Sequence, residues 1–470
     1  MIDAEPDLTT SWTYKNNNWL DTQTLENGAT ATYSYNSLGQ VTRLLNQISA
    51  TTISDFSGIA YDGVGNRTSV TASIPGTPSL SGTTSYTYDS KNQLTQETST
   101  RNGGFTDSFG YDSAGSPTSF KGATKSYNSN NQQTGTDFIY DGNGNPTTYA
   151  GITLTFDPEN HLSAYGSGLT AAYNGDGLRA WKQSAGARTY FLYDATVPVI
   201  ELDANGNVLA TTSFAANGLS SRRTASTSVF YSFDSEGNLA QRSDDLGTVL
   251  SNSLFDSHGA SLAGSFSEPF GYKAKFGYYT DSEAFLQLLT ERYYDPAFGR
   301  FLTRDPVGYG GGINLYSYTN NNPENSNDPD GLSGSDRWYG YNNRDFHRWF
   351  HRCWKQPGDA DATKEEIEEA YDEWVSRGSP SDGNCWGSSK KTAPSTCNEP
   401  ATARNRVARR YPGPSLDEFR LLEESNRQME TFWTKVLVGD AIVGAVLLAP
   451  EGAVVGAWRF LTRVPVPIRP

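Results

Sequence analysis

The chain has 470 residues, of which 36% are apolar and 13% aromatic, and its formal net charge is −15. This length favours roughly two to four domains, and the aromatic content argues against a disordered chain, since disordered chains lack aromatic residues. Residues 333–470 hold 19 basic and 19 acidic residues, so the whole net charge falls on residues 1–332. Such an acidic body disfavours non-specific binding to nucleic acid.

The chain starts with an acidic segment that lacks the apolar stretch of a signal peptide. A repeat pattern begins almost directly after it, so we interpret the sequence as a fragment of a longer protein. The three cysteines, Cys353, Cys385 and Cys397, all lie beyond residue 332 and show no zinc-binding spacing. We therefore predict no disulfide framework and no metal site, and no motif indicates a cofactor.

Residues 1–275 are dominated by a short repeat: an aromatic residue, then Asp or Asn, a turn rich in Gly and Asn, and an alternating strand. Alternation of this kind predicts β-strands, and Asp-Gly and Asn-Gly pairs supply the positive φ angles of tight hairpin turns. We predict a β-hairpin array that coils, and a conventional β-sandwich is the alternative. The aromatic residues of the repeats are Tyr35, Tyr61, Tyr88, Tyr111, Tyr127, Tyr140, Phe156, Tyr173, Tyr193, Phe233 and Phe255.

This unit resembles the YD repeat of Rhs proteins, teneurins and the C subunits of insecticidal toxin complexes. Residues 276–332 resemble the Rhs repeat-associated core domain, on the run Glu291-Arg-Tyr-Tyr-Asp-Pro-Ala-Phe-Gly-Arg-Phe-Leu-Thr-Arg-Asp-Pro-Val-Gly308 and the end Asp328-Pro-Asp-Gly-Leu332. The resemblance implies a hollow β-shell around a variable C-terminal polypeptide. It also implies that the core cuts this polypeptide free between Leu332 and Ser333, where the charge balance changes.

The residues of this segment allow only one kind of peptide hydrolysis. It contains no Cys, and the nearest histidines are His258 and His347, so hydrolysis would have to use carboxylates. Two close carboxylates cannot both ionise, which leaves one as the acid while the other activates water. The alternative is that the Asp-Pro pairs are only turn residues.

The resemblance implies an aspartyl-protease-like site and gives two of its residues. The Arg of the Arg-Tyr-Tyr run falls on Arg292, and the Asp of the following Asp-Pro-x-Gly falls on Asp305. We expect Asp305 to be an essential carboxylate and Arg292 its partner. For the second carboxylate we choose Asp328, with Asp330 second and Asp295 third.

Residues 333–470 are predicted to form a smaller, mainly α module. Apolar residues at helical spacing favour helices over 344–355, 363–375 and 415–436. His347 and His351 lie one turn apart, which suits a metal or a nuclease, but neighbouring arginines favour structural or solvated histidines. The basic run at 404–410 is interpreted as an exposed helix, with nucleic-acid contact as the alternative.

Residues 436–461 are apolar, with small residues at every fourth position, a pattern typical of closely packed helices, including those in membranes. Each half is shorter than the roughly 20 residues that span a bilayer. We interpret the segment as a buried or re-entrant helical hairpin, and membrane contact remains open.

These patterns favour a fragment of a secreted or cell-surface bacterial toxin. Its β-shell, residues 1–275, and core domain, residues 276–332, would enclose the C-terminal module 333–470 as cargo and release it by a single self-cleavage. A cognate immunity protein and a secretion-system component are the other partners that we expect. The alternative is an adhesion or wall-associated scaffold that does not cleave, and nothing in the sequence identifies a target for the tail.

Overall fold

The fold was analysed in a computed structural model, which describes residues 10–332 apart from 216 and 265–267, together with the single residues 350, 370, 371 and 373. The chain divides into two compact units, Met1–Tyr173 with Gly177–Asn384, and Asn174–Asp176 with Cys385–Pro470. Every strand of the described residues belongs to the first unit. Apart from these four single residues, the predicted C-terminal α module, including the segment 436–461, lies outside the described residues.

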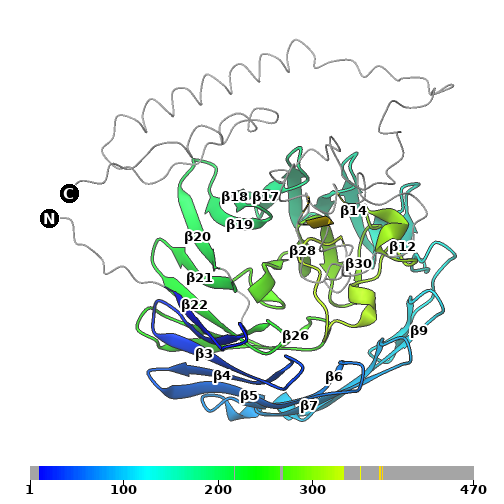
Figure 1. The fold of residues 1–470 in the computed structure, drawn as a ribbon. Helices are drawn as coiled ribbons and strands as arrows, with labels where there is room; N and C mark the ends of the chain where they lie inside the picture. The colour runs from blue at the N-terminus through cyan, green and yellow to red at the C-terminus, as the bar shows by residue number, and fades with distance from the viewer. Residues whose placement is uncertain are drawn as a thin grey trace. The chain divides into compact units, whose positions relative to one another are not determined.

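The described part of the chain is mainly β, as predicted. Its first sheet has 11 antiparallel strands, each hydrogen-bonded to its neighbours in sequence (Figure 1). These strands are β1 (Ser11–Tyr14), β2 (Leu20–Thr24), β3 (Ala29–Tyr35), β4 (Val41–Ile48), β5 (Thr51–Tyr61), β6 (Arg67–Ser73), β7 (Gly82–Tyr88), β8 (Leu94–Ser99), β9 (Phe105–Tyr111), β10 (Pro117–Phe120) and β11 (Ala123–Thr124).

The second sheet has 13 strands, again in sequence order. They are β12 (Phe138–Tyr140), β13 (Pro146–Tyr149), β14 (Ile152–Phe156), β15 (Leu162–Tyr165), β16 (Leu169–Tyr173), β17 (Arg179–Ser184), β18 (Ala187–Asp194), β19 (Val197–Leu202), β20 (Val208–Ala215), β21 (Gly218–Thr224), β22 (Ser228–Phe233), β23 (Leu239–Ser243) and β24 (Val249–Asn252). This strict order supports a hairpin array rather than a sandwich, and both sheets stay open within the part of the chain that is described.

Two smaller sheets complete the unit, one of them belonging to the predicted core domain. They consist of β25 (Leu254–Phe255) with β26 (Ser261–Ala263), and of β27 (Tyr279–Asp281), β28 (Leu286–Leu289), β29 (Arg292–Asp295) and β30 (Arg300–Phe301). Short 3₁₀ turns are η1 (Pro78–Leu80), η2 (Arg101–Gly103), η3 (Ala274–Phe276), η4 (Gly308–Gly311) and η5 (Thr319–Asn321). Among the described residues, no helix is long and apolar enough to cross a membrane.

The repeat turns are built by their acidic residue. Asp62 accepts hydrogen bonds at Oδ1 from the backbone N–H groups of Val64 and Asn66, at 3.0 and 2.8 Å. The positive φ falls on Gly65, at 96°, while Gly63 has none. Gly144 after Asn143 and Gly177 after Asp176 likewise have positive φ angles, of 88° and 78°, whereas Gly142 has none. The prediction therefore holds for a glycine at the fourth residue of the turn and fails for one at the second. The turn spans five residues and shifts the register of the strands beside it, so its left-handed residue comes two positions before the next strand.

The repeat tyrosines join one repeat to the one before it. Tyr61 donates its hydroxyl to the carbonyl of Val41 at 2.8 Å, and Tyr88 donates in the same way to Arg67 at 2.7 Å. Each acceptor is the first residue of a strand in the preceding repeat. The ring covers the sheet while its polar end is satisfied, which explains why Tyr suits this position in a half-buried array.

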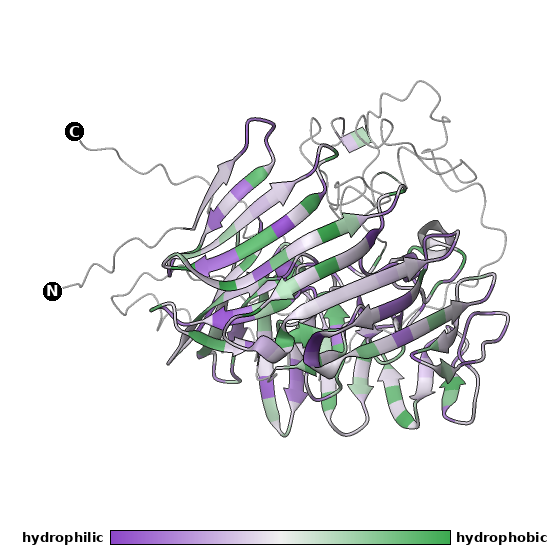
Figure 2. Ribbon diagram, turned by 90° about the horizontal axis from the view of Figure 1, so that it is seen from below, coloured by the Kyte–Doolittle hydropathy of each residue, from purple (hydrophilic) through white to green (hydrophobic). Residues whose placement is uncertain are grey.

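The two large sheets face each other and the core domain lies against both. Asn46 of β4 donates to the carbonyl of Phe233 at 2.8 Å, and Ser54 of β5 donates to Gln241 of β23 at 2.8 Å. Apolar residues alternate with polar ones along many strands (Figure 2), so each strand presents one apolar face. The strands β28 and β30 lie on the inner side of the curved sheets in Figure 1, and their residues belong to the larger apolar core.

Candidate active site

The predicted site lies where the hairpin of β28 and β29 meets the last described segment, 328–332. The two strands pair antiparallel, from Gln287 opposite Tyr294 to Leu289 opposite Arg292. The turn between them places Thr290 at a φ of 47°. From this turn, the N–H of Glu291 donates to the carbonyl of Asp330 at 3.2 Å. The end of the core domain is thus held beside the start of β29.

Arg292 is the centre of the site, and its side chain is 2% exposed. Its Nε donates to the carbonyl of Gly331, and its Nη1 donates to the carbonyl of Leu315 at 3.2 Å. The guanidinium stacks on Phe301, 3.6 Å from the ring centroid, which fixes its plane. A buried guanidinium needs this many partners because it cannot lose its charge.

The same guanidinium brings together two of the predicted carboxylates. Arg292 Nη2 lies 3.1 Å from Asp305 Oδ2 and 3.6 Å from Asp328 Oδ2. Because both oxygens lie close to the same nitrogen, the distance between them cannot exceed the sum of these two distances. Asp305 is fixed by its own turn, since its Oδ1 accepts from the N–H of Val307 at 2.9 Å and its N–H donates to the carbonyl of Leu315 at 2.8 Å.

Leu332, the residue on the carbonyl side of the predicted cut, contacts two carboxylates of its own segment. The N–H of Leu332 donates to Asp328 Oδ1 at 3.0 Å and approaches Asp330 Oδ1 at 3.3 Å. Leu332 is buried, and Gly331 before it adopts a φ of 72°. Ser333, on the other side of the predicted cut, lies outside the described residues.

The two other candidates for the second carboxylate, Asp330 and Asp295, have different surroundings from Asp328. Asp330 touches the Leu332 N–H, but the ion pairs of Arg292 within the described residues go to Asp305 and Asp328. Asp295 lies at the far end of β29, where its Oδ1 accepts from the N–H of Ala297 at 2.7 Å. Burial raises the pKa of Asp295 to about 6, in a site distinct from that of Arg292.

Two tyrosines complete the site and were missed by the sequence reasoning. The N–H of Asp328 donates to the hydroxyl of Tyr278 at 2.6 Å, and that hydroxyl lies 3.0 Å from the hydroxyl of Tyr318. Burial raises the pKa of Tyr278 far above its ordinary value, with the neighbouring Tyr318 adding to the effect, so the hydroxyl is neutral. No sequence signal distinguishes these two residues among 27 tyrosines.

Buried ion pairs fix the core domain against the repeat sheets. Arg179 of β17 pairs with Asp281 of β27, and Asp281 also lies 2.9 Å from Lys182. On the first sheet, Arg67 contacts Glu324 of the core domain, 3.6 Å away, and pairs with Glu236 of the β22–β23 turn. Since removing one partner of such a pair leaves a buried charge, these contacts fix the segments that carry the site.

Comparison with known proteins agrees with this architecture. The family model for the teneurin YD-shell matches residues 7–324. The tRNA nuclease WapA of Bacillus subtilis is 30% identical over 299 residues, which are 61% of this chain and 11% of that protein. The toxin protein Tse5 of Pseudomonas aeruginosa is 46% identical over 56 residues, 12% of this chain and 4% of that protein.

Solved structures show the same fold. The TcdB2-TccC3 crystal structure without its hypervariable C-terminal region superimposes with a TM-score of 0.58 at 20% identity, over 68% of this chain and 19% of that one. The Photorhabdus luminescens Tc holotoxin pore gives 0.57 at 19% identity, over 69% and 19%. The chain thus spans about a tenth of the WapA relative and a fifth of these structures. Since the family model covers most of the chain, the protein belongs to the teneurin YD-shell family, among relatives that are Rhs-type toxins.

Proposed function

We propose that the chain cuts itself once, between Leu332 and Ser333, and so separates residues 333–470 from the body. The observation that carries this proposal is the arrangement of Asp305 and Asp328 on one buried guanidinium, with the Leu332 N–H bonded to Asp328. The domain limits that go with it are 1–275 for the repeats, 276–332 for the core and 333–470 for the tail.

The chemistry needs one ionised and one protonated carboxyl. The ionised carboxylate takes a proton from a water molecule, whose oxygen adds to the carbonyl carbon of Leu332. The protonated carboxyl gives its proton to the nitrogen of Ser333 as the C–N bond breaks, leaving a carboxyl on Leu332 and an amine on Ser333. Arg292 favours the ionised form of its nearer partner, Asp305, so Asp305 is the base and Asp328 the acid.

The tail is then the effector of a polymorphic toxin. Three observations support this: the relatives include a tRNA nuclease and Tse5, a TccC3 structure is described as having a hypervariable C-terminal region, and the charge balance changes at residue 333. In this proposal the repeat sheets form part of a hollow shell around the tail. The toxin is secreted or displayed at a bacterial surface, and a cognate immunity protein protects the producer.

The cut is tested by mapping the new termini after expression of the whole chain. We expect a C-terminal fragment whose first residue is Ser333 and a body whose last residue is Leu332. The isosteric variants Asp328→Asn and Asp330→Asn separate the two candidates for the second carboxylate. Asp328→Asn is expected to abolish the fragment, while Asp330→Asn keeps it.

A fragment that begins at another residue would refute the assignment of the cut. An Asp330→Asn variant that fails to cut, beside an Asp328→Asn variant that still cuts, would exchange the roles of these residues. An intact chain that resists added protease over residues 10–332 would favour the non-cleaving scaffold instead.

A further inference from the structure

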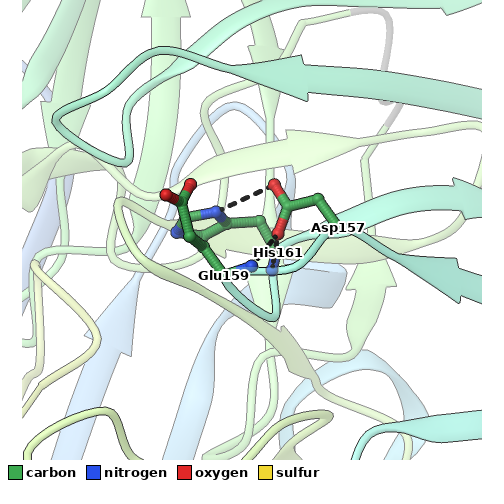
Figure 3. A group of neighbouring side chains, drawn as sticks. All are labelled: Asp157, Glu159 and His161. Atoms are coloured by element: carbon green, nitrogen blue, oxygen red, sulfur yellow. Dashed lines mark hydrogen bonds and ion pairs between the residues drawn. The ribbon is translucent and has the colours of Figure 1, made fainter. Parts of the chain in front are cut away.

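One repeat turn carries a histidine at its last position, where four other turns carry an asparagine. In four turns this position is an Asn whose Nδ2 donates to Oδ2 of the turn aspartate, at 2.8 to 3.1 Å. In the turn from Asp157 the position is His161, and its Nδ1 lies 3.1 Å from Asp157 Oδ2 (Figure 3). The imidazole thus replaces the amide within the turn, but it has a second nitrogen that an Asn side chain lacks. The four amide positions are Asn66, Asn145, Asn207 and Asn238.

The second nitrogen reaches the core domain. His161 Nε2 lies 3.8 Å from Oε2 of Glu291, and the two side chains are 11% and 9% exposed. The ring also stacks on Tyr173 of β16, with 4.6 Å between ring centroids and 24° between planes. The orientation of the imidazole is therefore fixed from three sides, by its own turn, by a neighbouring strand and by the core domain.

Glu291 connects this contact to the active site. It directly precedes Arg292, and its N–H donates to the carbonyl of Asp330. A displacement of Glu291 would therefore move the guanidinium of Arg292, which contacts Asp305 and Asp328. It would also move the segment 328–332, which carries Leu332. Among the described contacts, the bond from Glu291 to Asp330 is one of the few that join the two halves of the site through the backbone.

The charges around His161 favour its protonated form. Asp157 and Glu159 face it from its own turn, Glu291 from the core domain, and Tyr173 from β16. Burial lowers the pKa of His161, but the nearby carboxylates of Glu291 and Asp157 outweigh it, so the pKa is raised. An imidazolium donates from both nitrogens, which suits a ring between two carboxylates.

We propose that His161, as an imidazolium bridging Asp157 and Glu291, is a positioning residue for the cut after Leu332. This inference rests on the proposed self-cleavage and names the repeat turn on which that cleavage depends. It makes release of the tail conditional on correct docking of the core domain onto the turn between β14 and β15. It also makes release sensitive to pH through one residue.

The decisive variant is His161→Asn, because it installs the amide that four other turns carry and removes the reach of the ring to Glu291 together with its stacking on Tyr173. Asn207→Ala is the matched control, since it changes the same position of a turn whose described contacts do not include the core domain. Cleavage is followed by intact mass during cell-free synthesis at pH 6.5, 7.5 and 8.5. The cleavage rate of each variant is divided by the wild-type rate at the same pH, so that the effect of pH on the catalytic carboxyls cancels.

We expect His161→Asn to cut about tenfold more slowly than the wild type at pH 6.5, a loss in keeping with a displacement well below 1 Å at the site. The gap should narrow as the pH rises to 8.5, because the wild-type ring then loses its proton. Asn207→Ala should cut at the wild-type rate at every pH. An equal rate for His161→Asn and wild type, or a gap independent of pH, would overturn the proposal.

A second readout separates this inference from the cleavage itself. In an Asp305→Asn background, where no cut is expected, amide exchange is measured over residues 286–296 with and without His161→Asn. Faster exchange in the double variant supports the positioning role even if the wild-type chain proves not to cut, and unchanged exchange overturns it. Cleavage that EDTA abolishes would also overturn it, in favour of a cation at Asp157, Glu159 and His161.

Discussion

Replacing Gly331 by Ala tests how closely the segment 328–332 lies against the hairpin of β28 and β29. The φ of 72° at this position suits glycine. A Cβ added there would come 2.5 Å from the carbonyl oxygen of Leu289 and 3.3 Å from the nitrogen of Arg292. Both neighbours are backbone atoms of the hairpin, so neither can rotate away as a flexible side chain would.

The structure sets the size of the effect. The left-handed conformation costs a non-glycine residue about 1–2 kcal/mol. Relieving the contact with Leu289 requires the segment 328–332 to shift by about 1 Å. This shift also displaces the Gly331 carbonyl from Arg292. Overpacking of this kind costs about 1–3 kcal/mol of stability, whereas a 1 Å misplacement of reacting groups lowers a rate by about 10²-fold. The rate of cleavage should therefore fall by a larger factor than the stability of the fold would suggest.

The assay follows the fraction of cut chain against time by intact mass during cell-free synthesis. Thermal stability is measured in an Asp305→Asn background, so that cutting does not change the species that unfolds. Gly151→Ala is the matched control, since Gly151 has a φ of 79° but, among the described residues, nothing within 4 Å of an added Cβ. It carries the same conformational cost without the clash.

The expected result is a cut slowed by about 10²-fold for Gly331→Ala and an unchanged rate for Gly151→Ala. A wild-type rate for Gly331→Ala would refute the close approach of the strand to Leu289. An equal slowing by Gly151→Ala would show that general backbone strain, rather than the position of the strand, controls the cut.

Three further predictions concern the charges of the core domain. Arg292→Lys should slow the cut by about 10²–10³-fold in the same mass assay, because one ammonium cannot replace the contacts of three guanidinium nitrogens. A wild-type rate would contradict this. Arg179→Met should lower the free energy of urea unfolding by about 3 kcal/mol, since Asp281 then keeps only Lys182 as a charged partner among the described residues. The exposed pair of Arg43 with Asp55, 2.7 Å apart, should contribute below about 1 kcal/mol. The raised pKa of Asp295, about 6, means that its contribution is complete below pH 4 and is lost as the pH rises through 6. The stability difference between wild type and Asp295→Asn should therefore shift by about 3 kcal/mol between pH 4 and 7, and a constant difference would contradict the burial of this carboxyl.

Local features of the fold could be predicted from the sequence because the same residue types recur in each repeat unit. The tyrosine and the aspartate of each unit act within a few residues or one repeat, as Tyr61 does with Val41 and Asp62 with Asn66. The glycine that takes the positive φ could not be assigned at Gly63, because the turn is longer than two residues, which a dipeptide pattern does not reveal.

The site could be predicted in part. The match to a known core domain suggested Arg292 and Asp305, Asp328 was chosen as the second carboxylate, and the structure brings these three together. Asp295, the third candidate, lies at the other end of β29 from Arg292. The contacts that depend on distant segments, such as His161 with Glu291 or Tyr278 with Asp328, could not be found, since no local pattern specifies which turn the core domain meets.

The central claim is that this chain cuts itself with Asp305, and the intact mass of the purified protein tests it most directly. The whole chain and its Asp305→Asn variant are expressed side by side and their masses are measured. The account predicts two polypeptides for the wild type, meeting at Leu332 and Ser333, and one uncut chain for the variant. A single uncut chain in both samples, or two identical fragments in both, would contradict it.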